Sequence, residues 1–187
     1  MLILASESPR RRELLRQLGV GFEICPADVE ELAEGEEPES LPEKNALLKA
    51  RAVAERFPES YVLGADTGVF DGNRMLGKPR SPENALAMLL SLRDKTHKVI
   101  TGTALICLSK GVELSRSTVS RVTFGAFSSR DAVYYMEKVN VLDKAGAYAI
   151  QEHADILGAR WEGELENIIG LPVTTVREIL KENDLLD

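Results

Sequence analysis

Residues 2–19 read LILASESPRRRELLRQLG and place a strand directly before a helix. The apolar run at 2–5 is typical of a buried strand. Ser8 fits the N-cap of the helix, Pro9 its first position and Gly19 its end, so we expect a helix over 9–18. A strand that feeds a helix in this way is the unit from which α/β folds are built.

Three arginines occupy the first turn of this helix, at positions 10–12. A helix N-terminus carries roughly half a positive charge, so a cation there costs about 0.3–1 kcal/mol. The helical spacing directs Arg10 and Arg11 toward the core side, above free backbone N–H groups. A bound phosphate would account for this cluster, because arginine and a helix end both donate hydrogen bonds to it. The alternative is a solvated basic turn that pairs with Glu7 or Glu13.

Helices and strands alternate through the first half of the chain, and a β-hairpin dominates the centre. A capping box at Ser40–Glu43 indicates where one helix begins. The expected strands are 22–25, 61–65, 69–76 (a hairpin turning at 71–73), 98–108, 112–124, 147–151 and 156–161; the expected helices are 41–56, 82–92, 129–139 and 172–181. This pattern predicts an α/β fold in one domain over 1–187, a mixed twisted sheet with flanking helices and two lobes around a central cleft.

Composition narrows the possible partners and the compartment. The chain has 187 residues, 44% of them hydrophobic, and a net charge of −7. An acidic chain is a poor partner for nucleic acid, and no apolar run approaches the roughly 20 residues that cross a bilayer. Cys25 and Cys107 are too few for a disulfide scaffold, which favours the cytoplasm. His97 and His153 stand alone and do not predict a zinc cluster.

Asp66 is the first candidate for catalysis, because it directly follows the apolar run at 61–65. Open α/β sheets bind ligands beyond the carboxyl ends of their strands, and a carboxylate there can hold a divalent metal or take a proton from water. The alternative is an aspartate that caps a turn. If the next hairpin is centred on Gly72, Lys78 returns to the neighbourhood of Asp66, within about one residue of register. Lys78 would then bind a phosphate oxygen or simply pair with the carboxylate.

Three further polar residues are ambiguous when each is considered alone. Lys49 lies on a helix and reads as a surface lysine, and Glu31 belongs to a solvated acidic segment at 28–39. Together with Asp66, however, Glu31 can complete an oxygen-ligand set for magnesium, which takes one or two carboxylates plus substrate phosphates. Gln151 follows a run of small residues. It either reads the hydrogen-bonding edge of a base or is an ordinary strand-end glutamine.

Short motifs occur along nearly the whole chain in the order found in the Maf proteins, and on these motifs the chain resembles that family. That family comprises nucleoside triphosphate pyrophosphatases related in fold to inosine triphosphate pyrophosphatases. The resemblance rests on the segments SESPRR (6–11), KA (49–50), GADT (64–67), KP (78–79), HKVITG (97–102), KAGAY (144–148), IQ (150–151) and GLP (170–172).

The resemblance implies hydrolysis of a nucleoside triphosphate to the monophosphate and pyrophosphate with Mg²⁺ or Mn²⁺, in nucleotide-pool sanitation. It implies that Asp66 is the base and, with Glu31, the metal site. The implied phosphate-binding residues are Ser8, Arg10, Arg11, Lys49 and Lys78, and the implied specificity residues are Arg11, Thr67 and Gln151. It also implies a homodimer.

The residues at the specificity positions look like the branch of the family that acts on dTTP and UTP. Ala149 and Glu152 stand where that branch commonly has glycine. We expect the Gln151 amide to pair with a uracil or thymine edge, and a backbone N–H near Ala149 to reject cytosine. The alternatives are a preference for 7-methyl-GTP, a phosphomonoesterase, and a non-catalytic nucleotide-binding regulator of cell division.

Overall fold

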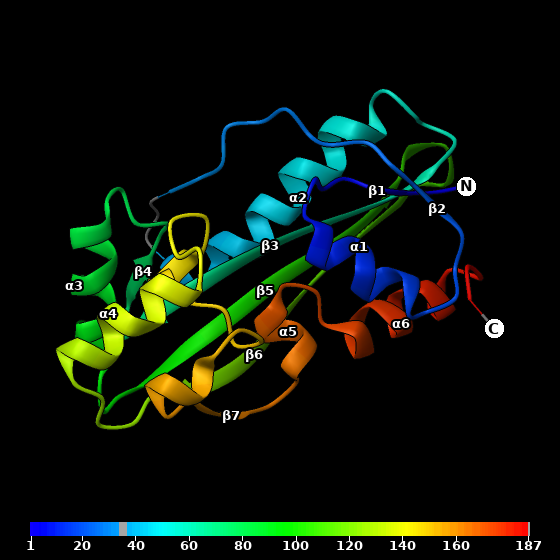
Figure 1. The fold of residues 1–187 in the computed structure, drawn as a ribbon. Helices are drawn as coiled ribbons and strands as arrows, with labels where there is room; N and C mark the ends of the chain where they lie inside the picture. The colour runs from blue at the N-terminus through cyan, green and yellow to red at the C-terminus, as the bar shows by residue number, and fades with distance from the viewer. Residues whose placement is uncertain (34–36, 187) are drawn as a thin grey trace.

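The computed structural model describes residues 1–33 and 37–186 (Figure 1). Within these residues, seven strands form one sheet in the order β2-β1-β3-β5-β6-β7, with β4 beside β3. β1 is parallel to β2 and β3, and the other neighbouring pairs are antiparallel. The predicted mixed α/β sheet is confirmed. Glu34 and Glu36 of the predicted acidic loop lie outside the described residues.

The bounds of the elements follow the chain. The strands are β1 Leu2–Leu4, β2 Phe22–Ile24, β3 Tyr61–Asp71, β4 Arg74–Leu76, β5 Thr96–Cys107, β6 Val112–Thr123 and β7 Arg160–Glu162. The α-helices are α1 Pro9–Arg16, α2 Leu41–Ala54, α3 Pro82–Leu92, α4 Ser129–Lys138, α5 Leu165–Ile169 and α6 Val173–Glu182. Short 3₁₀ turns are η1 Pro38–Ser40, η2 Leu108–Lys110, η3 Ala145–Ala147 and η4 Ala154–Leu157. None of the helices in the described part of the chain is long and apolar enough to cross a membrane.

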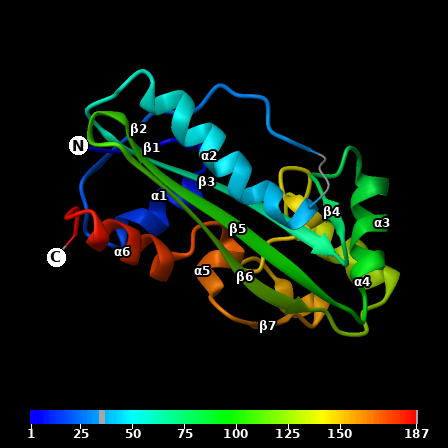
Figure 2. The ribbon, with the colours of Figure 1, turned by 180° about the vertical axis from the view of Figure 1, so that it is seen from behind.

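Helix α2 lies directly on one face of the sheet, along β3 and β5 (Figure 2). Two glycines allow this close approach. A Cβ at Gly64 would lie 2.2 Å from the carbonyl oxygen of Ala46, and one at Gly102 would lie 2.3 Å from the Cα of Glu43. Small residues at the contact therefore fix α2 over the middle of β3, where its polar face can reach the site.

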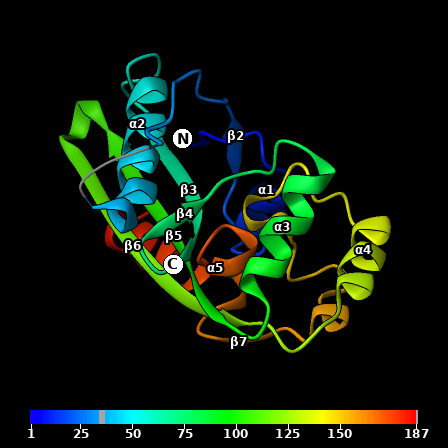
Figure 3. The same ribbon diagram turned by 90° about the vertical axis from the view of Figure 1, so that its left-hand side faces the viewer.

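The opposite face of the sheet carries two separate cores. One core packs α1 and α6 against β1 and the start of β3, and it includes Leu15 and Ile179. The other packs α3 and α4 against the far ends of β3 and β5, and it includes Phe124 and Tyr135. Figure 1 shows the two groups of helices at opposite ends of the long strands, and Figure 3 shows α2 and the α3–α4 pair on opposite sides. We call the end with α1 and α6 the first lobe and the end with α3 and α4 the second lobe.

Between the lobes, one edge of β3 has no neighbouring strand among the described residues. β1 pairs with β3 only over Tyr61–Leu63, and β4 pairs with it only over Val69–Asp71. Positions 64–68 are left open on that edge, although β5 pairs with them on the other side. The carboxyl end of β1 and the start of α1 open onto the same gap.

Several predicted elements match the structure and others do not. Ser8 caps α1 by accepting a hydrogen bond from the backbone N–H of Arg11, as predicted. The capping box at Ser40–Glu43 is wrong. Ser40 donates to the carbonyl of Glu37, and the Glu43 carboxylate accepts from two serines of β6.

Asp66 lies inside a long strand and not at a strand end, because β3 continues to Asp71. The β3–β4 hairpin is one residue out of the predicted register, pairing Asp71 with Arg74, and β4 ends before Lys78. Lys78 is therefore not a strand partner of Asp66, but both residues line the same cavity, in keeping with the predicted proximity. The predicted strands at 147–151 and 156–161 are also wrong in extent, since the chain there forms turns and 3₁₀ helix before β7.

Candidate active site

A cavity of about 480 Å³ lies at the open edge of β3, between the two lobes. It receives residues from the start of α1, the acidic segment, α2, β3, the loop after β4 and the turn after η3. All nine residues that the sequence analysis selected line it: Ser8, Arg10, Arg11, Glu31, Lys49, Asp66, Thr67, Lys78 and Gln151. The fold thus brings together side chains from positions 8 to 151 of the chain.

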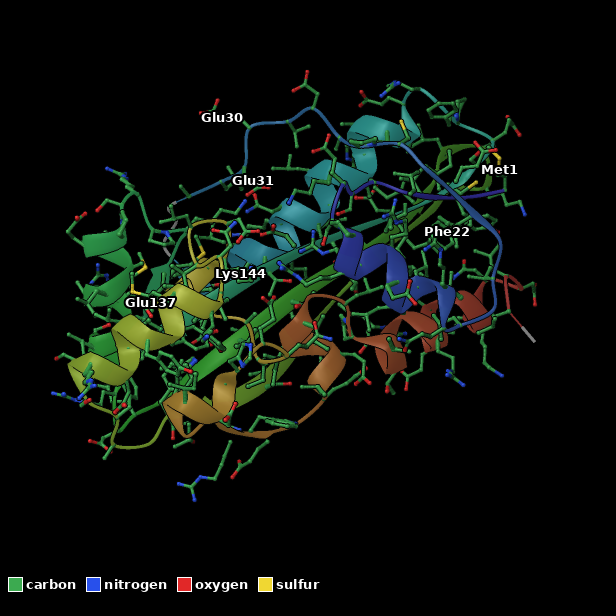
Figure 4. All side chains as sticks on the ribbon, viewed as in Figure 1. Met1, Phe22, Glu30, Glu31, Glu137 and Lys144 are labelled. Carbon is green, nitrogen blue, oxygen red and sulfur yellow. The ribbon has the colours of Figure 1, made fainter. Side chains whose placement is uncertain are left out.

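At the centre of the cavity, two carboxylates meet one ammonium group. Nζ of Lys49 lies 2.7 Å from Oδ1 of Asp66 and 2.6 Å from Oε1 of Glu31. The two oxygens are therefore at most about 5.3 Å apart, the sum of these distances. Figure 4 shows Glu31 on the segment that runs beside α2. Lys49 donates a hydrogen bond to Asp66 and forms an ion pair with Glu31. Since an ammonium has three donors, Lys49 can still donate to a ligand.

Asn45 completes this group, and the sequence analysis missed it. It is 2% exposed and lies one helical turn before Lys49 on α2. Its Nδ2 donates to Oδ2 of Asp66 at 3.3 Å and to the carbonyl of Leu32 at 3.1 Å, while its Oδ1 accepts from the N–H of Leu32 at 2.8 Å. The sequence did contain a signal for Asn45, because it is a polar residue next to Ala46 on the apolar side of a predicted helix.

Arg11 is held firmly inside the cleft. Its Nε donates to the carbonyl of Gly170 at 2.9 Å, Nη1 to Ser6 at 3.3 Å, and Nη2 to Thr67 at 3.1 Å. Burial lowers the pKa of Arg11, and the negative charges of Asp66 and Glu31 act in the opposite direction. Of its five N–H groups, three are used by the protein, so two are available to a ligand.

The basic turn is not neutralised by its local glutamates. Glu13 pairs with Arg16, not with an arginine of the first turn. Arg10, Lys78 and Gln151 are exposed along the cavity, and no side-chain hydrogen bond or ion pair occupies them within residues 1–33 and 37–186. Their donors therefore face the cavity without a protein partner.

The far end of the cavity is formed by the turn that carries Gln151. The N–H of Ala149 donates to the hydroxyl of Tyr135 at 2.9 Å, and that hydroxyl donates to the carbonyl of Ala149 at 3.3 Å. The N–H of Ala149 is thus already used and cannot contact a base, contrary to our expectation. Lys144, on the loop after α4 (Figure 4), donates to the carbonyl of Asn140 and to Asp143. Burial acts to raise the pKa of the Asp143 carboxyl, but the hydrogen bond and the charge of Lys144 act in the opposite direction, and the pKa lies below its usual value.

The two carboxylates can hold a divalent cation only when phosphates and water supply its remaining ligands. No group of three or more histidine, cysteine, aspartate or glutamate side chains gathers within the described residues. The Asp66 and Glu31 carboxylates do converge on one point, and magnesium is commonly held by one or two carboxylates with the remaining ligands from phosphates and water.

Comparison with known proteins agrees with this architecture. The family model described as "Maf-like protein" matches residues 1–183. A protein of Akkermansia muciniphila named dTTP/UTP pyrophosphatase is 44% identical over 180 residues, which are 96% of this chain and 94% of that protein. One of the same name from Myxococcus xanthus is 44% identical over 99% of this chain and 93% of its own length. The structure of the Staphylococcus aureus Ham1 protein superposes with a TM-score of 0.58 at 16% identity, covering 97% of this chain and 98% of that chain, a likeness of fold.

Proposed function

The chain belongs to the Maf family, and we propose that it hydrolyses dTTP and UTP to the nucleoside monophosphate and pyrophosphate. One observation carries the proposal for this chain. Two carboxylates meet at Lys49 in a cleft that Arg10, Arg11 and Lys78 also line. Such a site can bind a triphosphate and activate water beside it. The relatives of 44% identity carry the same activity in their names.

The cations bind and orient the triphosphate. Arg11 enters the cleft already fixed by three hydrogen bonds, so little conformational freedom is lost when it binds a phosphate. Lys49 offers a remaining N–H, and the exposed Arg10 and Lys78 add charge along the cavity. These groups stabilise negative charge as it develops on the departing pyrophosphate.

Asp66 is placed to take the proton of the attacking water. Lys49 and Asn45 hold its two oxygens, which sets the plane of the carboxylate. Water then attacks the α-phosphorus, the bond to the pyrophosphate oxygen breaks, and the proton passes to Asp66. Mg²⁺ or Mn²⁺, bound by Asp66, Glu31 and the phosphates, would neutralise charge and orient the water.

Base choice is assigned to Gln151, with Thr67 and Arg11, which line the same cavity. An amide offers both an acceptor and donors, which match O4 and N3–H of uracil or thymine. The family resemblance supports a cytoplasmic homodimer as the working form.

Product analysis tests the reaction. With UTP and Mg²⁺, we expect pyrophosphate and UMP in equal amounts. Release of inorganic phosphate without pyrophosphate would indicate a phosphomonoesterase, and binding without turnover in Mg²⁺ or Mn²⁺ would indicate a nucleotide-binding regulator. A panel of dTTP, UTP, CTP and 7-methyl-GTP compared by kcat/KM tests the substrate. A higher value for 7-methyl-GTP than for UTP would overturn the assignment of Gln151 and leave the reaction class standing.

A further inference from the structure

The turn that carries Gln151 is not held by a sheet, and its conformation needs support. Residues 149–152 form a turn closed by the N–H of Glu152, which donates to the carbonyl of Ala149 at 3.2 Å. Gln151 occupies the third position of that turn. The approach to it contains a strained residue, Ala147, with a φ of 64°. Such backbone costs about 1–3 kcal/mol and persists only where the surroundings hold it in place.

Two contacts anchor the chain just before the turn. Tyr148 is buried, and its hydroxyl lies 2.8 Å from Nε2 of His97, which fixes the side chain. At the next residue, the hydroxyl of Tyr135 bonds to both the N–H and the carbonyl of Ala149. The first anchor holds a side chain, whereas the second holds the backbone of the first residue of the turn.

Tyr135 itself is held in place by the core around it. It lies on α4, is completely buried in the core of the second lobe, and belongs to the largest side chains there. Burial raises the pKa of its hydroxyl to about 12, so the hydroxyl keeps its proton and can donate while it accepts. The position of Ala149 is therefore set from the core of the lobe.

We propose that Tyr135 is a positioning residue for base recognition, which holds Ala149 so that the turn presents the Gln151 amide to the pyrimidine. The inference rests on the proposed function and extends it to a residue that does not line the cavity. Without the hydroxyl, the turn samples other conformations, and the apparent affinity for the base falls with the fraction of molecules that hold Gln151 correctly. The phosphate end of the site, on α1, α2 and β3, is unaffected.

The test compares Tyr135→Phe with Tyr134→Phe, its exposed neighbour on the same helix. We expect Tyr135→Phe to lower kcat/KM for UTP about tenfold and to lower the preference for UTP over CTP by a similar factor. Most of the loss should fall on KM. Ribose 5-triphosphate, which has no base, should be hydrolysed within twofold of the wild-type rate. Tyr134→Phe should match the wild type with every substrate.

A double-mutant cycle with Gln151→Ala shows whether Tyr135 acts through Gln151. In the Gln151→Ala background, Tyr135→Phe should cause no further loss of selectivity. An equal loss with UTP and ribose 5-triphosphate would overturn the proposal, because it would show a general structural role. If Tyr135→Phe does not fold, Gln151→Ala alone decides: unchanged selectivity between UTP and CTP in that variant refutes the inference.

Failure of the proposed function is recognised separately. If the wild-type protein releases no pyrophosphate, calorimetric titration with α,β-imido-UTP and α,β-imido-CTP replaces turnover. Weaker and less selective binding by Tyr135→Phe would still support the positioning role. Equal binding of both analogues by the wild type and by Tyr135→Phe would overturn it.

Discussion

Gly64→Ala tests whether the seating of α2 on β3 sets the geometry of the site. A Cβ at this position would lie 2.2 Å from the carbonyl oxygen of Ala46, where ordinary contact begins at 3.4 Å. The obstructing atom belongs to the helix backbone and cannot rotate away. Helix α2 would therefore have to move from β3 by about 1 Å, and it would carry Asn45 and Lys49 with it.

The expected size of the effect follows from that displacement. Overpacking a core costs about 1–3 kcal/mol, and a backbone obstacle places this site at the upper end. Alanine restricts the unfolded chain and returns about 0.4–1 kcal/mol, so the net loss in unfolding free energy should be about 2 kcal/mol. A misplacement of about 1 Å between catalytic groups can lower the rate about 100-fold, so kcat should fall by one to two orders of magnitude.

Urea denaturation and initial rates with UTP, measured well below the melting temperature, check both numbers. Gly21→Ala is the matched control, because nothing lies within 4 Å of its added Cβ. The reasoning is refuted if Gly64→Ala loses less than about 0.5 kcal/mol, the usual scatter of surface substitutions, and keeps the wild-type kcat.

Three other predictions address single side chains. Asp66→Asn should retain less than about a tenth of kcat, a loss above about 1.4 kcal/mol in transition-state stabilisation, while α,β-imido-UTP still binds by calorimetry; a higher kcat contradicts its role as base. Asn45→Ala should lower the Mn²⁺ affinity of the complex with that analogue about tenfold by electron paramagnetic resonance, whereas Leu48→Ala, on the same helix, should not change it. Burial lowers the pKa of His97 to about 4 from 6.5. The unfolded chain therefore takes up this proton first as the pH falls, and about 3 kcal/mol of stability is lost between pH 6.5 and pH 4. His97→Gln should flatten that part of the urea-derived stability curve, and an unchanged slope would exclude His97 as the cause.

Local signals in the sequence identified the ends of most helices and the residues that line the cleft. The Ser8 cap of α1 was predictable because its partner, the backbone N–H of Arg11, lies only three positions away. The open edge of β3 was not visible, because it depends on where β1 ends and β4 begins to pair. The sequence therefore suggested that Asp66 follows the end of its strand. In the structure, β3 continues past Asp66, and the strand that ends at this gap is β1.

The positioning residues were hidden for a related reason. The partners of Asn45 lie 13 and 21 residues away, and that of Tyr135 lies 14 residues away, at distances with no fixed pattern in the sequence. The small apolar run at 147–151 is typical of a strand. It is instead bent by a positive φ at Ala147 and anchored by tertiary contacts, which outweigh its local preference.

The two lobes are opposite ends of the same strands, and this limits how the cleft can move. β3 spans 11 residues and β5 spans 12, and the two strands run past the site without a break. Domain closure usually depends on a few hinge residues in loops, whereas bending this sheet would distort many backbone hydrogen bonds at once. The stiffness of the sheet therefore sets the width of the cleft. A ligand must fit a cleft of nearly fixed size.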